Sequence, residues 1–383
     1  MTNYRCAVIG GAGGRGSGWA REMKQWKSLL GHTIELVAIC DISDIALQSK
    51  AEKLKVKAYK DYKEMLDKEK LDFVINATPH YVHAPIMIAA AEHGAHVLSE
   101  KPMCINLKQA DEMKAAVEKN KIVCAIGFQH RFNPIYRGIR NAITAGDLGF
   151  VFQLNMIFHW FRTEDYYLNS SPVPENADAD WEGWRGHWKT EGAGALANQI
   201  IHFMDQFLWF SPSPVQSVMA ASRIARHEHV ETDDNTNVIV EFQNGSMGLC
   251  QMGVAYKSGK REDFAIYGTE GALETGRGLK GALGVPKLYN DMRKGTAKVT
   301  HSMLERMGPK NLQLNKALFS NFLEAIVKDD RKIISVDVNE GRKSVEFMRG
   351  ILLSIKEGKK VTFPFDDNFS APELMRTFTE KSV

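Results

Sequence analysis

A short apolar strand that runs directly into a glycine-rich turn constrains this chain more than any other feature. Residues 5–9 are almost entirely apolar, and the turn that follows places Gly11, Gly13 and Gly16 at the spacing G-x-G-x-x-G. These glycines permit a tight turn, a close approach of the backbone to a pyrophosphate and the packing of a helix on the strand. Apolar residues at helical spacing come next, so we predict a helix that ends at Gly31 and whose free amides face the phosphates.

The residue that ends the second predicted strand bears on which dinucleotide binds. This strand covers residues 34–40 and ends at Asp41, about the distance downstream at which a ribose-binding carboxylate is expected. A carboxylate there accepts hydrogen bonds from the ribose hydroxyls and repels a 2′-phosphate, so NAD is favoured over NADP. Arg15 and Ser43 keep NADP open, because either side chain can meet a phosphate. Helix capping is the alternative role for Asp41, and Ser43 can also fill it.

Strands and helices alternate at regular spacing through the region that follows the glycine turn. This alternation is typical of a parallel, doubly wound sheet, in which ligands bind at the carboxyl ends of the strands. The predicted strands cover residues 71–76, 95–99 and 122–126, and the predicted helices cover residues 62–68 and 83–93, with a third helix that begins after Asn106.

Polar side chains stand at these carboxyl ends. Lys101 lies beside Glu100 directly after the strand 95–99, and Pro102 ends that strand. A lysine that is partly removed from water next to a carboxylate can have its pKa tuned for proton transfer. The alternative interpretation is an ordinary surface ion pair on a loop. The other candidate binding residues at the strand ends are Thr78, Pro79, His80, His83, Gln129, His130 and Arg131.

The pattern changes after Gly127, so we expect a dinucleotide-binding domain over residues 1–127 and a second domain over residues 128–383, with packing of the last helix and strand back toward the first domain left open. The later segments are longer, richer in predicted strands and poorer in helices, and Asn244-Gly245 marks a hairpin turn. We predict an α+β domain with a large, mostly antiparallel, open sheet. The predicted strands cover residues 150–161, 215–221, 237–242, 246–252 and 262–267, and helices are predicted at residues 314–328 and 340–356.

A polar stripe lies within the apolar segment 191–205. If this segment forms one helix, Asn198, His202 and Asp205 are three or four residues apart and lie on one face. Polar groups among apolar neighbours are costly to bury unless they are used, so His202 is a candidate for proton transfer. The alternative is a histidine whose hydrogen bonds are satisfied within the core.

The composition argues against several other classes of protein. The chain has 383 residues, of which 44% are hydrophobic and 25% charged. Its net charge of +3 is close to balance, so the sequence does not indicate a basic face that binds nucleic acid. No apolar run reaches the length of a membrane span, and the first strand begins at Tyr4, so we expect a cytoplasmic protein without a signal peptide. The five cysteines lack metal or redox spacing. We interpret them as reduced core residues, with Cys104 as the candidate for a solvent-reachable thiol, and we expect no metal.

Together these motifs resemble the Gfo/Idh/MocA family, the group of glucose-fructose oxidoreductases and inositol dehydrogenases. The resemblance covers nearly the whole chain and rests on the glycine turn, Asp41, the segment from Thr78 to His83, Glu100-Lys101-Pro102 and the helix of His202. It implies an N-terminal Rossmann domain, a C-terminal domain whose open sheet supports a homodimer or homotetramer, and NAD or NADP as cofactor.

The resemblance also implies roles for individual residues. Lys101 is expected to be the active-site lysine, His202 the acid/base histidine and Glu100 a residue that orients Lys101 or contacts the cofactor. Asn198 departs from the family pattern, because many of these dehydrogenases carry an aspartate there, and an amide cannot stabilise an imidazolium by charge. The expected cofactor-binding residues are Gly11, Gly13, Gly14, Arg15, Gly16, Asp41, Thr78, Pro79, His80, His83, Glu100, Lys101, Gln129, Trp184 and Arg185, and the expected substrate residues are His130, Arg131, Trp160, Arg162, Tyr166, Asn198 and His202.

We therefore expect an NAD(P)-dependent dehydrogenase that transfers a hydride between nicotinamide and a ring secondary alcohol of a sugar, sugar derivative or cyclitol. Lys101 and His202, from separate domains, are expected to hold that hydroxyl. The loop 162–189, which includes Asp180, is expected to set the substrate. Two alternatives remain open, redox-assisted glycoside cleavage with tightly bound NAD and a non-catalytic dinucleotide-sensing protein. The aromatic residues expected to stack on the substrate, whose alternative role is core packing, are Trp160, Phe161, Trp184 and Trp188.

Overall fold

The computed structural model describes residues 2–168, 183–227, 230–275, 286–289, 313–370 and 373–374. The chain forms two compact units, and each contains more than one segment of sequence. The first unit comprises residues 1–128, 165–192 and 315–345, and the second comprises residues 129–164, 193–314 and 346–383. Two segments that we predicted within the second domain, 165–192 and 315–345, thus pack in the first unit.

The first unit is built on a seven-stranded sheet in the order β2-β3-β1-β5-β6-β7, with β4 also paired to β3. All pairs are parallel except the short pair of β2 with β3, which confirms the predicted doubly wound sheet. The strands are β1 (Asn3–Ile9), β2 (Ser28–Leu29), β3 (His32–Cys40), β4 (Lys57–Tyr59), β5 (Phe73–Asn76), β6 (His96–Ser99) and β7 (Cys124–Ile126). The helices are α1 (Gly14–Gln25), α2 (Asp44–Leu54), α3 (Tyr62–Lys68), η1 (His80–Val82), α4 (His83–Glu92), α5 (Leu107–Asn120), α7 (Asp165–Leu168), α8 (Trp188–Glu191), α11 (Leu314–Lys328) and η4 (Arg331–Ile333).

Helix α1 ends earlier than its apolar spacing predicts. We expected it to continue to Gly31, but it ends at Gln25, and β2 and β3 then form a hairpin with Gly31 at its turn. Trp26 stacks on Phe319 of α11 with the ring centroids 5.8 Å apart. The apolar residue that continued the helical pattern is therefore used against a helix almost three hundred residues away in sequence, which no local pattern can show.

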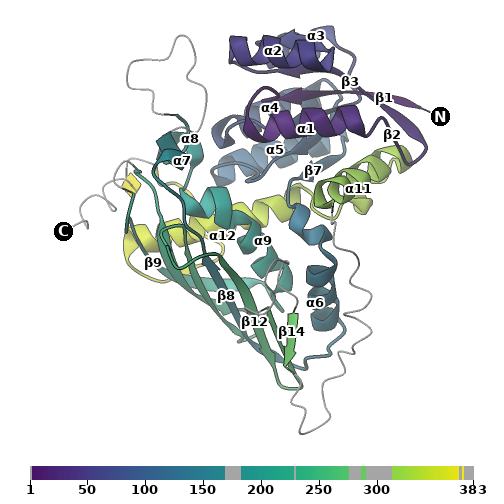
Figure 1. Cartoon of the computed structure of the whole chain (residues 1–383). Coiled ribbons are helices and arrows are strands. Elements are labelled where there is room, and N and C mark those ends of the chain that lie inside the picture. The colour runs from purple at the N-terminus through teal and green to yellow at the C-terminus, as the bar shows by residue number, and fades with distance from the viewer. Residues whose placement is uncertain are drawn as a thin grey trace. The chain divides into compact units, whose positions relative to one another are not determined.

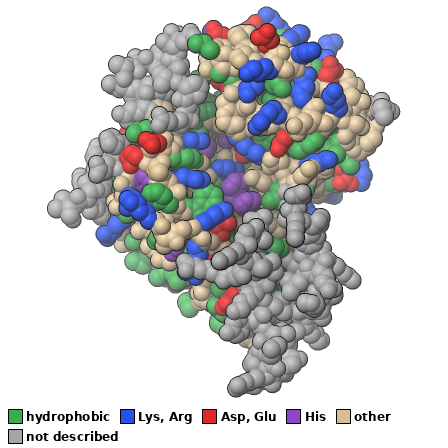
Figure 2. Space-filling model, viewed as in Figure 1, with side chains coloured by type: hydrophobic (Ala, Val, Ile, Leu, Met, Phe, Trp, Pro, Cys, Tyr) green, Lys and Arg blue, Asp and Glu red, His purple; other side chains and the backbone are tan. Residues whose placement is uncertain are grey.

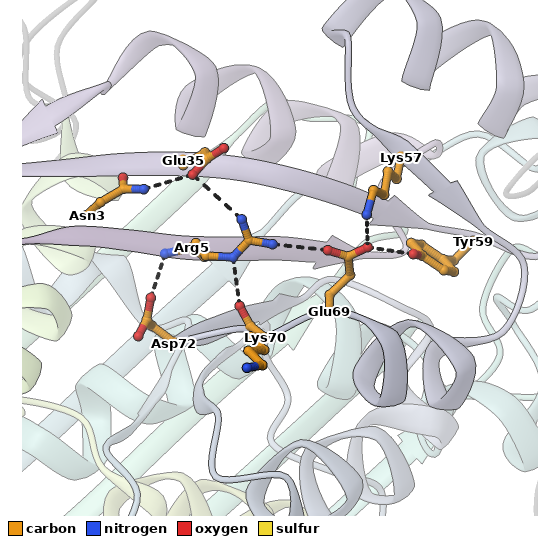
Figure 3. Close-up of polar contacts among 8 residues, drawn as sticks. All are labelled: Asn3, Arg5, Glu35, Lys57, Tyr59, Glu69, Lys70 and Asp72. Carbon is orange, nitrogen blue, oxygen red and sulfur yellow. Dashed lines mark hydrogen bonds and ion pairs between the residues drawn. The ribbon is translucent and has the colours of Figure 1, made fainter.

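A buried carboxylate joins several elements of this unit (Figure 3). The side chain of Glu69 is only 2% exposed and accepts hydrogen bonds from Lys57 Nζ at 2.6 Å, Tyr59 Oη at 2.6 Å and Arg5 Nη2 at 3.1 Å. Burial opposes its charge, but Lys57, Tyr59 and Arg5 outweigh burial and hold the pKa of Glu69 below its ordinary value. Glu69 therefore links β1 and β4 to the connection between α3 and β5.

The second unit is built on an eight-stranded sheet in the order β14-β13-β12-β8-β11-β10-β9-β15. Every pair is antiparallel except β8 with β11, so the predicted mostly antiparallel sheet is confirmed. The strands are β8 (Val151–His159), β9 (Val215–Arg223), β10 (Asn235–Phe242), β11 (Met247–Gly253), β12 (Arg261–Gly268), β13 (Ala272–Thr275), β14 (Pro286–Tyr289) and β15 (Val361–Thr362). The helices are η2 (Gln129–Phe132), α6 (Pro134–Thr144), the π-helix η3 (Leu196–Ile200) and α9 (Ile201–Phe210), and α12 (Val338–Glu357) begins in the first unit and ends in the second.

Among the described residues, helices cover only one face of this sheet. Helices α6, α9 and the second half of α12 lie on the covered face (Figure 1), where Phe207 of α9 packs between Phe242 of β10 and Phe347 of α12. The opposite face carries alternate exposed residues of β9, β10 and β11. The sheet therefore has the one-sided core predicted from its sequence.

The cysteines lie in the core. All five are buried and free of disulfides. The interpretation of Cys104 as a solvent-reachable thiol is therefore wrong, because its side chain is enclosed and its thiol donates to the carbonyl of Asn106 at 3.3 Å. Within the described residues, no helix combines the length and the apolar character needed to cross a membrane.

Replacing Glu69 by Gln should lower the free energy of unfolding by about 1–3 kcal/mol, because it removes the charge toward which three donors are directed. The pKa of Glu69 is depressed in the folded state, so this stabilisation is present above the ordinary glutamate pKa and is lost as pH falls through the folded-state value. Urea denaturation of both proteins at pH 7 and at stepwise lower pH measures the difference, which should shrink on acidification.

Glu64→Gln is the matched control. Its carboxylate is 48% exposed and pairs with Lys68 at 2.6 Å on the surface of α3, and such pairs contribute little. Equal losses for the two variants, or a loss at Glu69 that does not depend on pH, would contradict this account.

Candidate active site

Packing requires two of the glycines in the turn, and two others face open space. A Cβ on Gly16 would lie 2.0 Å from the carbonyl oxygen of Gly10, and a Cβ on Gly11 would lie 2.9 Å from Ile39 Cβ, so packing alone requires these two glycines. A Cβ on Gly13 or Gly14 would meet no atom within 4 Å. The absence of side chains there leaves the backbone open to a ligand, which fits the close approach of a pyrophosphate.

The start of helix α1 and Asp41 complete this end of the site. Gly13 is the N-cap of α1 and makes no side-chain capping bond, and the first turn carries no acidic residue. The terminal amides are therefore suited to an anion. Asp41 accepts hydrogen bonds from the amides of Ala12 at 3.0 Å and Gly13 at 3.3 Å, and also from the amide of Ser43 at 3.2 Å. Its carboxylate thus braces the turn in addition to the ribose-binding role that we predicted.

Glu100 is buried and accepts hydrogen bonds from two side chains, so it is not part of a surface ion pair. Its Oε1 accepts hydrogen bonds from Arg15 Nε at 2.6 Å and from Trp19 Nε1 at 2.8 Å, and only 6% of the residue is exposed. Arg15 also donates to Asn315 Oδ1 at 2.7 Å. The interpretation of Glu100 as a surface ion pair on a loop is therefore wrong. Arg15, one of the two residues that kept NADP open, is directed toward Glu100 and Asn315.

Lys101 follows Glu100 at the carboxyl end of β6. Burial lowers the pKa of Lys101 to about 8, with further lowering by the charges of Arg15 and Arg185 and partial opposition from Glu100 and Glu191. An amine with this pKa exchanges a proton readily near neutral pH. Lys101 therefore has the property expected of an acid/base group.

Two buried histidines follow the neighbouring strand β5. His83 is fully buried, and its ring nitrogens lie 2.7 Å from the carbonyl oxygen of Pro102 and 2.9 Å from that of Thr78. His80 is also buried, and its Nδ1 lies 2.9 Å from the carbonyl oxygen of Glu191. Burial, and then the charge of Lys101, lower the pKa of His80 well below its ordinary value. These contacts make His83 a brace between the loops after β5 and β6.

The segment 183–192 lies against these loops in the first unit. Trp184 meets His80 edge to face with the ring centroids 4.6 Å apart, and Arg185 lies over Tyr166 at 4.4 Å and over Trp184 at 5.1 Å. Trp184 and Arg185 therefore stand beside the predicted cofactor residues of this unit. Residues 169–182, including Asp180, lie outside the described residues.

In the second unit, the segment of His202 is not one regular helix. A π-helix covers Leu196–Ile200 and α9 begins at Ile201, so Asn198, His202 and Asp205 do not follow a simple helical face. Asp205 is fully buried and accepts two hydrogen bonds from Arg131, at 2.7 and 2.9 Å. Asn198, His202 and Asp205 therefore do not form one polar stripe. The guanidinium of Arg131, which we predicted to contact substrate, binds Asp205.

A buried acid that the sequence analysis missed holds the start of this segment. Asp233 accepts hydrogen bonds from the amides of Gly194 at 2.9 Å and Leu196 at 3.0 Å. Burial raises the pKa of Asp233 to about 7, although the amides oppose that shift. Gly194 is required here, because a Cβ would lie 2.2 Å from Thr232 Oγ1. The Asp233-Asp234 doublet before β10 was the only local signal for this anchor.

Aromatic rings connect His202 to the end of β8. His202 stacks on His130 at 4.7 Å, His130 meets Phe203 at 5.7 Å, and Phe203 meets Phe158 at 4.7 Å. Phe158 in turn meets Trp160 at 4.9 Å. His130, Trp160 and His202, all predicted to contact substrate, are thus parts of one packed cluster in the second unit.

Comparison with known proteins gives two family matches. Residues 4–128 match the oxidoreductase family with the NAD-binding Rossmann fold, and residues 136–274 match the GFO/IDH/MocA C-terminal domain. This chain belongs to the Gfo/Idh/MocA family. The resemblance noted in the sequence is therefore confirmed, and with it the NAD-binding Rossmann domain.

Individual relatives of the family are distant. The myo-inositol 2-dehydrogenase of Thermotoga maritima is 24% identical over 62% of this chain and 66% of its own length, and the levoglucosan dehydrogenase of Pseudarthrobacter phenanthrenivorans is 27% identical over 56% and 57%. The chain thus spans no more than about two thirds of these relatives. The structure of the WlbA dehydrogenase of Bordetella pertussis, in complex with NADH and UDP-GlcNAcA, superimposes with a TM-score of 0.80 at 22% identity and covers 96% of this chain and 99% of that one. That likeness shows the shared fold.

The structure thus groups the predicted site residues within their own units. The first unit brings together the glycine turn, Asp41, Thr78, His80, His83, Glu100, Lys101, Tyr166, Trp184 and Arg185, and the second contains Gln129, His130, Arg131, Trp160, Arg162, Asn198 and His202. The convergence of Lys101 and His202 on one hydroxyl stays a prediction. Among the described residues, His, Cys, Asp and Glu side chains form no group of three or more that is suited to a metal ion.

Gly13→Ala should impair NADH binding, whereas Gly16→Ala should impair folding. Gly13→Ala should fold normally, because its Cβ meets no protein atom, but it should weaken NADH binding at least ten-fold by filling the space for the pyrophosphate. Gly16→Ala should lower the midpoint of thermal unfolding, because its Cβ overlaps the Gly10 carbonyl. NADH fluorescence titration and calorimetry measure these effects, and unchanged affinity in Gly13→Ala would contradict the assignment.

Proposed function

We propose that this protein is an NAD-dependent dehydrogenase that oxidises a secondary hydroxyl of a carbohydrate or cyclitol ring. The observation that carries the proposal is Lys101, an amine with a pKa of about 8 at the carboxyl end of β6, in the unit that also holds the glycine turn. Open α/β sheets bind ligands at these strand ends. A dinucleotide sensor needs the glycine turn but has no need of a tuned amine.

The residues of the first unit fit NAD. The open space at Gly13 and Gly14 and the uncapped start of α1 suit the pyrophosphate, and the carboxylate of Asp41 suits an unphosphorylated ribose. NAD, when bound, accepts the hydride at the nicotinamide ring. The NAD-binding Rossmann domain of the family supports this choice. We rank NAD above NADP because Arg15 is directed toward Glu100.

Lys101 and His202 both act on the substrate hydroxyl group. In the oxidation, Lys101 in its neutral form accepts this proton, and His202 orients the hydroxyl through a hydrogen bond. Asn198 binds a neighbouring hydroxyl rather than stabilising a charged imidazole. Positioned proton transfer of this kind accelerates a reaction by roughly 10²–10⁴-fold.

The substrate class is inferred from the relatives. Two are named for an inositol and for levoglucosan, and the WlbA structure contains the sugar nucleotide UDP-GlcNAcA with NADH. All three molecules carry ring secondary hydroxyls. A panel of inositols, free sugars, anhydrosugars, uronates and sugar nucleotides, followed by NADH absorbance, therefore tests the activity.

We propose that the face of the second sheet opposite helices α6 and α9 is a surface between copies of this chain. Met219, Ile239 and Leu249 face one another across β9, β10 and β11 and are 49%, 55% and 48% exposed. Met247, two residues before Leu249 on β11, adds to the same side, and Figure 2 shows hydrophobic side chains along the lower left of the surface, over this sheet. A row of large apolar side chains is costly to leave in water, so it favours association.

Lys101→Ala and His202→Ala should each lower kcat for alcohol oxidation by about 10²–10⁴-fold while NADH still binds. In the wild type, kcat/KM should rise with pH and level off above about 8, because only the neutral amine accepts a proton. Near-normal turnover in both variants would overturn the assignment. Stopped-flow NADH formation over pH 6 to 10 measures both effects, and NADH titration provides the binding control.

Lys substitutions at Ile239 and Leu249 together should convert the oligomer into a monomer, because two charges then lie in the apolar row. Ile45→Lys is the control, since that side chain is 79% exposed on α2 and lies outside this sheet. Light scattering coupled to size exclusion gives the masses. A wild-type protein that stays monomeric at tens of micromolar would contradict the proposal.

A further inference from the structure

The segment from Trp184 to Gly192, in the first unit, folds back on itself. The amide of Gly186 donates to the carboxylate of Glu191 at 2.7 Å, and the hydroxyl of Thr190 donates to the carbonyl of Trp184 at 2.6 Å. Glu191 is completely buried. A buried carboxylate is costly unless hydrogen bonds and opposite charges compensate it, so the charges near Glu191 bear on its role.

The loops that follow β5 and β6 both contact the end of this segment. His80, in the loop after β5, has its Nδ1 2.9 Å from the carbonyl oxygen of Glu191. Because a carbonyl oxygen only accepts hydrogen bonds, this nitrogen carries the proton. Gly192 packs against the loop after β6, where a Cβ on Gly192 would lie 2.6 Å from Ile105 Cβ. Glu191 is therefore held between these two loops, and Lys101 stands in the second of them.

Arg185 is held near the start of the same segment. Its guanidinium lies 4.4 Å from the ring centroid of Tyr166 and 5.1 Å from that of Trp184. Trp184 in turn meets His80 edge to face, with the ring centroids 4.6 Å apart. The segment thus carries one cationic and one anionic side chain, and His80 contacts it near both of them.

Both charges of this segment act on Lys101. The titratable groups that interact electrostatically with Lys101 are Glu100, Arg15, Arg185, Glu191, His80 and His83. Burial lowers the pKa values of the two histidines, so both are neutral at pH 7 and above. Burial also lowers the pKa of Lys101 to about 8, the two arginines lower it further, and the two glutamates oppose that lowering. The segment therefore exerts two opposite effects on one amine.

We propose that Glu191 is a positioning residue for the proposed reaction, which acts through Lys101 by stabilising the ammonium form against the positive charge of Arg185. An amine among cations and apolar groups is a weak base, and a fixed carboxylate restores its ability to accept the hydroxyl proton. This inference rests on the proposed function for the role of Lys101 as proton acceptor. It rests on the contacts of the segment for the location of Glu191.

Glu191→Gln tests this role, because it keeps the shape of the side chain and an oxygen for the amide of Gly186 but removes the charge. Loss of a nearby negative charge lowers the pKa of an amine, so the pH at which kcat/KM reaches half its plateau should fall by about 0.5–1 unit. At pH 7 the variant should be about two- to five-fold faster than the wild type, because more of Lys101 is neutral. The plateau at high pH should change by less than about three-fold, because a slightly weaker base loses little activity.

Arg185→Met should have the opposite effect on the pH profile. It keeps an apolar stem beside Tyr166 and Trp184 but removes the cation, so the midpoint should move to higher pH. The double variant should lie between the two single variants, since the two charges act on the same amine. Glu92→Gln is the matched control, because it removes an exposed carboxylate from the end of α4 and should not move the midpoint.

A second measurement does not depend on turnover. Neutral amines react with acetic anhydride and ammonium groups do not, so the pH dependence of acetylation at Lys101, followed by peptide mass spectrometry, titrates this amine directly. Its midpoint should fall in Glu191→Gln and rise in Arg185→Met. Lys63, which is exposed on α3, is the internal reference, and its acetylation profile should be the same in every variant.

A lower plateau in Glu191→Gln without a shift of either midpoint would overturn the inference, because it would indicate a purely structural role for this side chain. Shifts of the same sign in Glu191→Gln and Arg185→Met would also overturn it. Failure of the proposed function gives a different result. In that case no compound of the panel yields NADH, while the acetylation midpoints of the two variants still move apart. Thermal unfolding of each variant shows that the folded protein was measured.

Discussion

The buried carboxylate of Glu100 is the interaction on which the first unit's candidate site depends. One of its oxygens accepts hydrogen bonds from Arg15 and Trp19, which lie one turn apart on helix α1. The other oxygen faces Gly127, where a Cβ would lie 3.1 Å from it. An ionised carboxylate is costly to bury unless donors surround it, so this geometry is tightly specified. It fixes the helix that starts at the glycine turn relative to the residue before Lys101. The surface that receives the dinucleotide and the candidate proton acceptor are therefore joined through one side chain.

Features with local causes were predicted well from the sequence. The glycine turn, the helix start after Asn106 and the sheet of alternating strands follow from neighbouring residues, and the structure contains each of them. The end of helix α1 was predicted too late, because Trp26 has the spacing of a helical residue while its partner, Phe319, lies far away in sequence. Apolar periodicity reports that a side chain is buried, but it does not report against which element.

The same limit explains which parts of the site were missed. Lys101 and Glu100 were found because they stand at a strand end, yet their neighbour Arg15 lies 85 residues from Glu100. The sequence predicts Arg131 as a substrate residue, because its pattern does not distinguish a side chain that faces a ligand from one that pairs with a buried acid 74 residues away. The π-helix before His202 has no periodic signature, and it depends on Asp233 and on the close approach of Thr232 to Gly194. The sequence lacked the long-range partners, and their absence also explains why the π-helix and the end of α1 were not predicted.

The single parallel pair in the second sheet has a consequence for how such proteins diversify. Strand β11, which is parallel to β8, and strand β10 both lie between β8 and β9, so the chain cannot pass from β8 to β9 by a hairpin and leaves the sheet before it enters β9 three positions away. That excursion carries the segment with Trp160, Arg162 and His202. Its length and composition can change while the hydrogen-bonded ladder stays in register, since both of its ends are anchored in strands that pair with other neighbours. The sheet can therefore be conserved during evolution while the segment that carries the candidate substrate residues changes.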